Sequence, residues 1–445
     1  MTLKDDFHRT ISMGAVAQRA SSASPRSEGD RYLEPSEIWT DAQRIAHQRA
    51  RLGTLLAALV TNPFYVAKYG RRRSVDDWAN LPFTSKSELS ADQAGHQPFG
   101  SNLTYALDRY TRLHQTSGTT GRPLRILDTA ESWEWWQRCW EFVYRAAGVT
   151  ARDRIFFCFS FGPFVGFWSA FSGAERIGAL CISGGAQSTA ERAASIIATN
   201  ATVLVCTPTY ALRLAETARE QGIDLVYSSL RVSVHAGEPG ASIPTTRVRI
   251  ESALGVCAFD HAGATEVGAY GFSCEARDGL HVIEREFVAE IRDSAGNVAS
   301  EGEGELVLTN LGRLATPAVR YRTGDHVKAA RGRCECGRTL LKLQGGIIGR
   351  VDDMVVVRGV NVYPSSIEAV VRRFPEVGEF RLEITSERGM SEIKCVVEAR
   401  ADDDALLVAI ADAIHRDIGI RCAVTAVAPG ILPRSDMKAN RVVRR

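Results

Sequence analysis

The segment HQTSGTTGRPL, residues 114–124, concentrates glycine together with serine and threonine hydroxyls. Glycine lets backbone N–H groups converge on an anion, and the hydroxyls add further hydrogen-bond donors. This composition predicts a phosphate-binding loop, and a surface turn is the alternative. Neither GxxxxGK[ST] nor GxGxxG occurs in the segment, so a Walker loop and a Rossmann turn are not expected here.

Five further segments with chemistry-bearing side chains follow this loop in the sequence. They are HAGEPG at 235–240, FDHAGATEVG at 259–268, RYRTGDHV at 320–327, GRVDDMVVVRGVNVYPSSIE at 349–368 and LPRSDMKANRVV at 432–443. Each segment alone is weak evidence. As an ordered set, from about residue 80 to the C-terminus, they resemble the adenylate-forming superfamily and, within it, the phenylacetate–CoA ligase family. RGVNVYPSSIE and PRSDMK are the most family-specific pieces.

The resemblance implies a reaction in two steps. A carboxylate is a poor electrophile, because its charge repels nucleophiles and oxide cannot leave. Attack of the carboxylate on the α-phosphate of ATP gives an acyl-adenylate and pyrophosphate, and the thiol of coenzyme A then displaces AMP. Catalysis of such steps rests mainly on positioning and on neutralisation of phosphate charge.

The resemblance also assigns roles to individual residues. Thr265 is expected to hydrogen-bond the α-phosphate and Glu266 to hold Mg²⁺, which favours carboxylate and phosphate oxygens; a solvated loop carboxylate is the alternative for Glu266. Asp325, assisted by Arg350, is expected to accept hydrogen bonds from both ribose hydroxyls. The β- and γ-phosphates are expected at Thr116, Ser117, Gly118, Thr119, Thr120 and Gly121. Further ATP contacts are expected at Gly237, Glu238, Pro239 and Asp260, with a tight turn after a strand as the alternative for 237–239.

One position departs from the family pattern. The family usually has an aromatic residue that stacks on adenine where this chain has Ala262. Stacking of an aromatic ring on a base is worth roughly 1–3 kcal/mol in single-stranded nucleic-acid complexes. The alanine therefore predicts weaker ATP binding or space for a differently shaped substrate, but it does not exclude adenylation.

The C-terminal motifs carry the residues expected to act from a mobile domain. Lys438 matches the catalytic lysine, whose ammonium would bridge the carboxylate and the α-phosphate; a surface lysine is the alternative. Asp352 matches the hinge about which the small domain rotates between the two half-reactions. After rotation the segment 358–362, including Arg358, Gly359 and Val360, would line the tunnel for the thiol.

Two cysteines of the GRCECGRTL segment, Cys334 and Cys336, are candidate metal ligands together with Cys274 and His281 upstream. Three thiolates and one imidazole suit a closed tetrahedral zinc site. Some members of the family that the chain resembles share this arrangement. A structural zinc ion is expected, and a pair of reduced cysteines in a turn is the alternative.

The acid substrate is expected to be aromatic. The resembled family prefers aryl and arylacetic acids, and the segment 160–171 offers rings for an apolar slot. The expected pocket residues are Phe161, Phe164, Phe167, His235, Ala262 and Gly263, where His235 would read a ring hydroxyl or amine. Packing between a strand and a helix is the alternative for each phenylalanine.

Three functions remain open at this point. The first is an aryl–CoA ligase, and the second is an enzyme that passes the activated acid to a carrier-protein thiol or an amine. The third is a nucleotide-binding protein without catalysis, against which the presence of Thr265, Glu266, Asp325 and Lys438 argues. The small-molecule partners expected are the acid, ATP with Mg²⁺ and coenzyme A. A homodimer stays open.

Composition argues against several classes of protein. The 54 basic and 52 acidic residues give a net charge of +2, so neither nucleic acid nor a membrane is an expected partner. No apolar run is long enough to span a bilayer, and residues 1–30 lack the apolar centre of a signal peptide. Ten cysteines without a secretory signal indicate a reducing cytoplasm rather than a disulfide framework.

The order of patterns along the chain predicts an α/β fold with two domains. Residues 1–30 are expected to be a disordered tail. Short apolar runs alternate with helical patterns between 150 and 240, which predicts parallel βαβ units, and 280–345 reads as hairpins. We therefore expect a large domain at 31–350 with a β-rich subdomain, and a small mobile α+β domain at 351–445.

Overall fold

The computed structural model describes residues 33–70, 74–116, 122–238, 240–357, 360–387, 390–400, 403–433 and 441–444. The predicted N-terminal tail lies outside these residues. One predicted site segment, 117–121, and four predicted site positions, Pro239, Arg358, Gly359 and Lys438, lie outside them as well.

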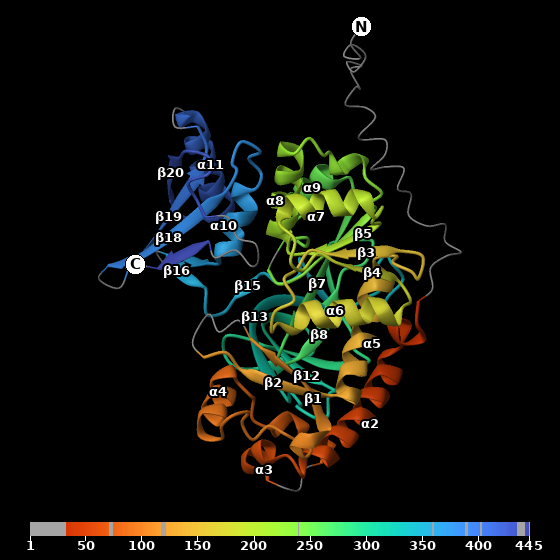
Figure 1. The fold of residues 1–445 in the computed structure, drawn as a ribbon. Coiled ribbons are helices and arrows are strands. Elements are labelled where there is room, and N and C mark those ends of the chain that lie inside the picture. The colour runs from red at the N-terminus through yellow and green to blue at the C-terminus, as the bar shows by residue number, and fades with distance from the viewer. Residues whose placement is uncertain are drawn as a thin grey trace.

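A thirteen-stranded sheet forms the centre of the large domain (Figure 1). Its parallel part has the order β7-β6-β5-β3-β4. The short central strands β3, β5 and β6 are buried, whereas β4 at the edge is partly exposed. The elements in chain order are β3 (Arg154–Phe157), α6 (Val165–Arg176), β4 (Leu180–Ser183), α7 (Thr189–Ala198), β5 (Val203–Cys206), α8 (Pro208–Glu220), η5 (Leu225–Tyr227), β6 (Val232–His235), α9 (Pro244–Leu254) and β7 (Cys257–Ala264). The predicted βαβ units are thus confirmed.

The antiparallel part continues the same sheet from β7. This strand pairs in parallel with β6 and antiparallel with β8, so the predicted β-rich subdomain is continuous with the parallel strands. Its elements are β8 (Gly268–Phe272), β9 (Gly279–Val282), β10 (Phe287–Arg292), β11 (Val298–Ala299), β12 (Gly302–Asn310), β13 (Tyr321–Ala330), β14 (Lys342–Gln344) and β15 (Gly349–Arg350). β15 pairs with β13, which brings the end of the large domain back to the sheet.

The N-terminal elements pack along one side of this sheet (Figure 1). They are η2 (Pro35–Ile38), α2 (Asp41–Leu59), α3 (Pro63–Tyr69), η3 (Val75–Asn80), α4 (Lys86–Gly95), η4 (Leu107–Arg109), β1 (Tyr110–Gln115), β2 (Arg125–Thr129) and α5 (Ala130–Ala146). β1 and β2 form the hairpin that flanks the glycine-rich segment. The helix after that segment is α5, which buries Trp135, Trp136 and Trp140 in the core.

The C-terminal residues build a separate four-stranded sheet with helices against it (Figure 1). The elements are β16 (Val355–Val357), β17 (Val360–Val362), α10 (Pro364–Val371), β18 (Phe380–Glu387), β19 (Met390–Glu398), α11 (Asp404–Ile418), β20 (Ala423–Val427) and β21 (Val442–Arg444). Their hydrophobic cluster begins at Val355, whereas the clusters of the large domain end at Leu343. Separate cores on either side of 343–355 favour the boundary expected at residue 351.

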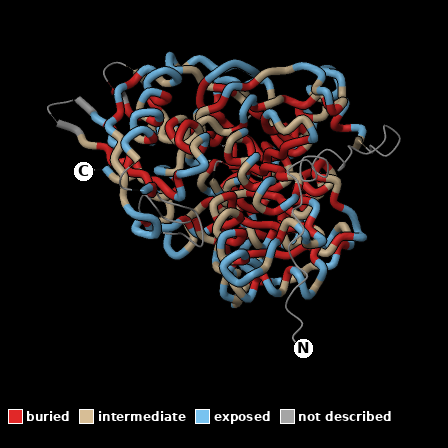
Figure 2. Tube along the Cα trace, turned by 90° about the horizontal axis from the view of Figure 1, so that it is seen from above, coloured by how far each residue is buried: buried red, intermediate tan, exposed pale blue. Residues whose placement is uncertain are grey.

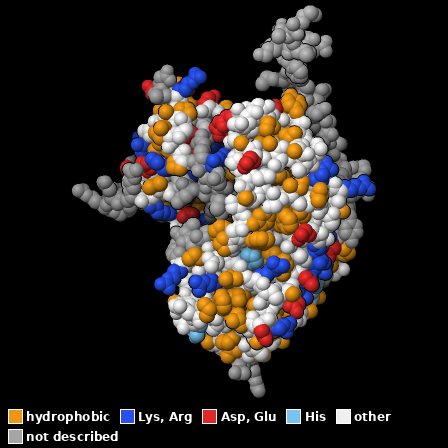
Figure 3. Space-filling model, viewed as in Figure 1, with side chains coloured by type: hydrophobic (Ala, Val, Ile, Leu, Met, Phe, Trp, Pro, Cys, Tyr) orange, Lys and Arg blue, Asp and Glu red, His pale blue; other side chains and the backbone are white. Residues whose placement is uncertain are grey.

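Buried residues fill the interior of both parts, and exposed residues cover the outside (Figure 2). On the face shown in Figure 3, basic and acidic side chains are interspersed around a central group of hydrophobic ones. This mixture agrees with the small net charge. Among the described residues, no helix combines the length and apolar character that a bilayer crossing requires.

Candidate active site

The predicted ribose site lies where β13 meets β15. Asp325 and Arg350 are opposite each other in this pair, and the Nη1 of Arg350 donates to Oδ1 of Asp325 at 3.0 Å. The hydroxyl of Tyr270 donates to the other carboxylate oxygen at 3.1 Å. Gly324 precedes the aspartate with a φ of +75°, a conformation that favours glycine. The carboxylate is therefore held in a fixed orientation by two donors.

The predicted magnesium ligand, Glu266, follows β7 and is buried. The hydroxyl of Tyr321 donates to its Oε1 at 3.2 Å, and the Nζ of Lys86 lies 3.4 Å from the same oxygen. Lys86 begins α4 and is 38% exposed, so its ammonium neutralises Glu266 at the edge of the solvent. Lys86 was not among the predicted site residues, because one lysine at the start of a helix carries no signal of its own. Tyr321 lies in the RYRTGD motif and could have been included.

The described ends of the glycine-rich loop are closed by hydrogen bonds between Thr116 and Leu124. The Thr116 amide donates to the Leu124 carbonyl, and the Leu124 amide donates to the Thr116 hydroxyl, each at 3.0 Å. These two bonds fix Thr116 and Leu124 to each other on either side of the glycine-rich segment. The neighbouring Thr265 accepts a hydrogen bond at its carbonyl from Arg313 at 2.7 Å.

The predicted adenine side is formed by the end of β6 and by β7. Gly237 has a φ of +94°, and Oε1 of Glu238 accepts from the Thr209 amide at 2.9 Å. The carboxylate of Asp260 accepts from the Ser242 amide at 3.0 Å, and burial raises its pKa to about 6. The first bond holds the turn after β6 to the start of α8, and the second holds Ser242 against β7.

Two small residues of β7 belong to the same wall. Ala262 is 8% exposed and pairs with Gly271 across the sheet. A Cβ on Gly263 would lie 3.1 Å from the Gly268 carbonyl oxygen and from the His261 ring. Gly263 therefore allows the close approach of β7 and β8 immediately before Thr265.

The expected role of His235 at the pocket wall is corrected by its surroundings. The side chain is fully buried, Nε2 lies 2.7 Å from the Ser233 hydroxyl, and Nδ1 lies 3.2 Å from the Cys206 carbonyl. Burial lowers its pKa to about 4. Both ring nitrogens already have partners inside the sheet, so His235 presents no free nitrogen to a substrate.

The three expected pocket rings gather at the start of α6. Phe167 stacks on Phe159 with centroids 3.8 Å apart, and Phe164 lies at its edge at 6.5 Å. Phe161 packs edge-on against Trp168 at 4.9 Å. All three expected rings are partly buried. They form a partly exposed aromatic cluster at the border between the hydrophobic core and the surface.

The predicted hinge lies in an exposed turn between the two hydrophobic cores. Asp352 accepts from the Nε of Arg350 at 3.1 Å, and its carbonyl accepts from Arg444 at 3.4 Å. Arg350, from the predicted ribose site, thus also contacts the predicted hinge residue Asp352. Val360, from the predicted tunnel segment, begins β17 and pairs with Val357.

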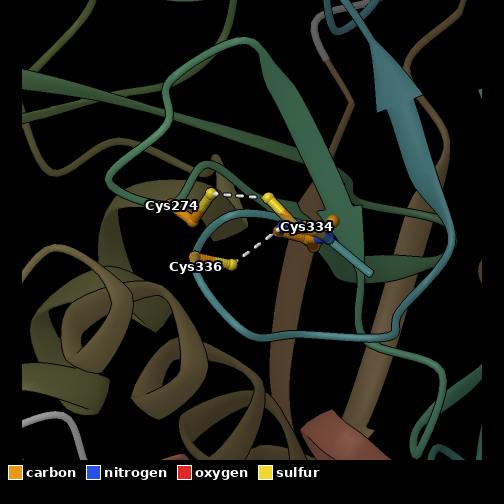
Figure 4. Close-up of side chains that lie close together, drawn as sticks. Cys274, Cys334 and Cys336 are labelled. Atoms are coloured by element: carbon orange, nitrogen blue, oxygen red, sulfur yellow. Dashed lines mark hydrogen bonds between the residues drawn. The ribbon is translucent and has the colours of Figure 1, made fainter. Parts of the chain in front are cut away.

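The four predicted metal ligands come together in the β-rich part of the sheet (Figure 4). Cys274 follows β8, His281 is on β9, and Cys334 and Cys336 lie in the turn between β13 and β14. One ligand atom from each residue lies within 4.8 Å of all the others. The Cys274 and Cys334 sulfurs are 3.8 Å apart, and Cys336 Sγ lies 3.6 Å from His281 Nε2.

The electrostatics of this cluster favour thiolates at two positions. The pKa of Cys336 is lowered mainly by a hydrogen bond from Cys274. The pKa of Cys334 is lowered mainly by a hydrogen bond from His281. The thiolate is the form of cysteine that binds metal. The clustering predicted from sequence positions up to 62 residues apart, from 274 to 336, is confirmed.

Comparison with known proteins agrees with this geometry. Residues 359–445 match the family model described as AMP-binding enzyme C-terminal domain. The phenylacetate-coenzyme A ligase of Pseudomonas putida is 32% identical over 433 residues, which cover 92% of this chain and 96% of that protein. The corresponding enzyme of Thermus thermophilus is 32% identical over 390 residues, covering 82% and 86%.

Solved structures of 2-hydroxyisobutyryl-CoA ligase extend the similarity to the fold. In the postadenylation state, in complex with R3-HIB-AMP, that enzyme gives a TM-score of 0.85 at 29% identity, covering 93% of this chain and 94% of the other. In the thioesterification state, with 2-HIB-AMP and CoA, the TM-score is 0.69 at 30% identity, covering 94% and 93%. The chain belongs to the phenylacetate–CoA ligase family of adenylate-forming enzymes, because the sequence similarity extends along nearly the whole chain and the ordered motifs lie on the same fold.

Proposed function

We propose that the protein activates an aromatic carboxylic acid with ATP and transfers the acyl group to the thiol of coenzyme A. The observation that carries the proposal is the placement of Asp325 on β13 and of Thr265 and Glu266 directly after β7, where Tyr321 of β13 donates to Glu266. Acceptors for a ribose and a buried carboxylate for a cation are groups that an adenylation site requires. Relatives named phenylacetate-coenzyme A ligase support the choice of acid and thiol.

The residues of the large domain would divide the binding of ATP among them. Asp325, oriented by Tyr270 and Arg350, would accept from the ribose hydroxyls. The loop that begins at Thr116 would donate to the terminal phosphates. Lys86 is placed to neutralise phosphate charge as well, since its Nζ is partly exposed beside Glu266.

Glu266 fits a hard divalent cation. Its carboxylate is buried, and the charge of Lys86 at 3.4 Å balances it in this structure. Mg²⁺ bound there would neutralise phosphate charge during attack on the α-phosphate. Lys438, which the resemblance assigns to the same step, would bridge the substrate carboxylate and the α-phosphate.

The aromatic cluster around Phe164 and Phe167 supports an aromatic acid. Phe164 is the residue directly before α6, and the rings of Phe164 and Phe167 are partly exposed where the parallel strands end. A flat apolar acid could pack against such rings at little desolvation cost. A carrier-protein thiol or an amine is the alternative acceptor for the acyl group.

Acid-dependent release of pyrophosphate tests the proposed function. A panel of aryl, arylacetic and short aliphatic acids would be compared, each with ATP and Mg²⁺ and with or without coenzyme A. We expect the fastest release with an aromatic acid, and formation of its CoA thioester. Release that never leads to a thioester would favour the alternative acceptors, and no release with any acid would reject the proposed activity.

We also propose that Cys274, His281, Cys334 and Cys336 hold a structural zinc ion. The donor set suits tetrahedral zinc, and the four ligand atoms already lie within 4.8 Å of one another. The buried Nδ1 of His281 has no hydrogen-bond partner within the described residues. The cluster joins the turn between β13 and β14 to β8 and β9, so zinc would stabilise this part of the sheet.

A further inference from the structure

A fully buried ion pair lies between the glycine-rich hairpin and the Glu266 loop. Arg313, in the connection between β12 and β13, donates from Nε to Oδ1 of Asp128 and from Nη2 to Oδ2, each at 2.7 Å. Both side chains are completely buried. Two parallel hydrogen bonds fix the plane of the guanidinium as well as its position.

The remaining nitrogen of this guanidinium reaches the predicted catalytic loop. Nη1 of Arg313 donates to the Thr265 carbonyl at 2.7 Å and lies 3.4 Å from the Glu266 carbonyl. Asp128 is on β2, the strand that follows the phosphate-binding segment. The Arg313 guanidinium therefore joins β2 to the backbone that carries Thr265 and Glu266.

A second hydrogen bond supports the same connection. The hydroxyl of Thr316 donates to the Leu127 carbonyl at 2.8 Å, next to Asp128 on β2. The indole ring of Trp136 lies 5.3 Å from the Arg313 guanidinium. The guanidinium is thus packed as well as hydrogen-bonded, and it has little freedom to move.

His114, a second titratable residue near Asp128, does not supply a positive charge to this carboxylate. His114 Nδ1 lies 3.9 Å from the carboxylate, and its ring stacks on Trp133. Burial lowers the pKa of His114 to about 4, so the imidazole is neutral at pH 7. Arg313 is consequently the charge partner of Asp128 at neutral pH.

We propose that Arg313 is a positioning residue for adenylation, which fixes the Thr265–Glu266 backbone relative to β2. The proposal rests on the proposed roles of Thr265 and Glu266 in binding the α-phosphate and Mg²⁺. The hydrogen bonds of Arg313 to the described residues go to one carboxylate and to main-chain carbonyls, so it acts through these residues. Lysine cannot replace it, because an ammonium lacks the planar fork that reaches both segments at once.

The test compares Arg313→Lys with a matched variant, Arg231→Lys. Arg231 makes the same kind of contacts, two bonds to Asp153 at 3.1 and 2.6 Å and one to the Gly148 carbonyl at 3.0 Å. Arg231 and Asp153 precede β6 and β3, whereas Thr265 follows β7. The control therefore lies at the opposite end of the parallel strands.

The measurement is calorimetric binding of two probes, adenosine and ATP with Mg²⁺, at a temperature at which each variant is folded. Arg313→Lys should weaken binding of Mg²⁺–ATP about tenfold or more, since misplacement by about 1 Å can cost as much as 100-fold in an oriented site. Adenosine affinity should change less than about twofold, because Asp325 is held independently. Arg231→Lys should leave both affinities within about twofold of wild type.

A double variant, Asp128→Leu with Arg313→Met, covers the case in which the lysine variant does not fold. Replacing both members of a buried pair with apolar residues is often neutral for stability, whereas removing one member is costly. The double variant should show the same selective loss of Mg²⁺–ATP binding. Wild-type affinity for Mg²⁺–ATP in a folded variant, or equal loss for both probes, would overturn the proposal. A wild-type protein that releases no pyrophosphate with any acid would instead reject the proposed function.

Discussion

At the residue scale, burial sets the properties of the carboxylates around the site. Asp325 receives hydrogen bonds from Tyr270 and Arg350 and is partly exposed on β13. Asp260 is buried in the same wall, and its main partners are backbone amides of Ser242 and His261. Desolvation raises the pKa of Asp260 to about 6, because burial disfavours the charged form more than these bonds favour it.

The raised pKa of Asp260 predicts a pH-dependent effect of Asp260→Asn. The folded protein holds a proton at this site up to about pH 6, while the unfolded chain loses it near pH 4. Between these values the wild type therefore loses stability as the pH rises. The free energy of unfolding of the variant, relative to wild type, should increase by roughly 2–3 kcal/mol from pH 4 to pH 7. Denaturant unfolding at both pH values measures this difference, and a constant difference would contradict the prediction.

Ala262 provides a second prediction at this scale. If adenine lacks the aromatic neighbour that the family usually supplies, Ala262→Tyr should lower the KM for ATP and leave the KM of the acid nearly unchanged. A gain of one stacking contact corresponds to roughly 1–3 kcal/mol. Steady-state kinetics with the acid found in the pyrophosphate assay measures both constants. Loss of acid binding would show instead that Ala262 makes space for the substrate.

At the element scale, the turn between β13 and β14 depends on the cysteine cluster. This turn carries Cys334 and Cys336, whereas Cys274 follows β8 and His281 is on β9, the strand that pairs with β14. The side chain of Arg338 from the same turn is paired with Glu37 near the N-terminal edge of the described chain. The cluster therefore fixes a turn to which N-terminal residues are also attached.

The proposed zinc site predicts about one zinc per chain in purified protein without an affinity tag. Cys334→Ser combined with Cys336→Ser should lose the metal and unfold at a lower temperature, because binding to a structural site contributes folding free energy. Cys395→Ser is a suitable control, since Cys395 is buried in the other domain. Elemental analysis and thermal unfolding provide the measurements. Wild-type protein that is free of metal and fully stable would exclude the site.

At the scale of the whole molecule, several contacts hold the small domain against α8 and α9 (Figure 1). Arg441 donates to the Thr209 hydroxyl at 2.9 Å, and Arg249 donates to the Val377 carbonyl at 3.2 Å. A cavity of about 490 Å³ lies between these elements. The arrangement is more similar to the postadenylation structure of 2-hydroxyisobutyryl-CoA ligase than to its thioesterification structure.

A rotating small domain predicts that Lys438 serves adenylation alone. Lys438→Ala should lose acid-dependent pyrophosphate release by roughly two to three orders of magnitude, the usual worth of one preorganised donor. The variant should still convert a synthetic acyl-adenylate and coenzyme A to the thioester. Gly359→Trp should have the reverse effect by filling the proposed thiol tunnel. Equal damage to both half-reactions by Lys438→Ala, with the fold intact, would argue against rotation.

Local sequence patterns were sufficient for the main elements and for one group of site residues. The short apolar runs of β3, β5 and β6 are typical of buried parallel strands, and the positions of Cys274, His281, Cys334 and Cys336 suit a metal site. The roles expected of Asp325 and Glu266 stay predictions, and they rest on ordered patterns that are shared with a known family.

Only the tertiary structure decided which of the remaining residues meet. Lys86 approaches Glu266 across 180 positions of sequence, and Arg313 reaches Asp128 across 185. Contacts between such distant positions leave no periodicity or spacing in a single sequence. His235 was misassigned for the same reason: its type suggested chemistry, but packing between β5 and β6 gave both ring nitrogens partners inside the sheet. Residue type and local pattern determine which elements form and which groups can react, whereas the burial and the distant partners of each group arise only when the elements pack.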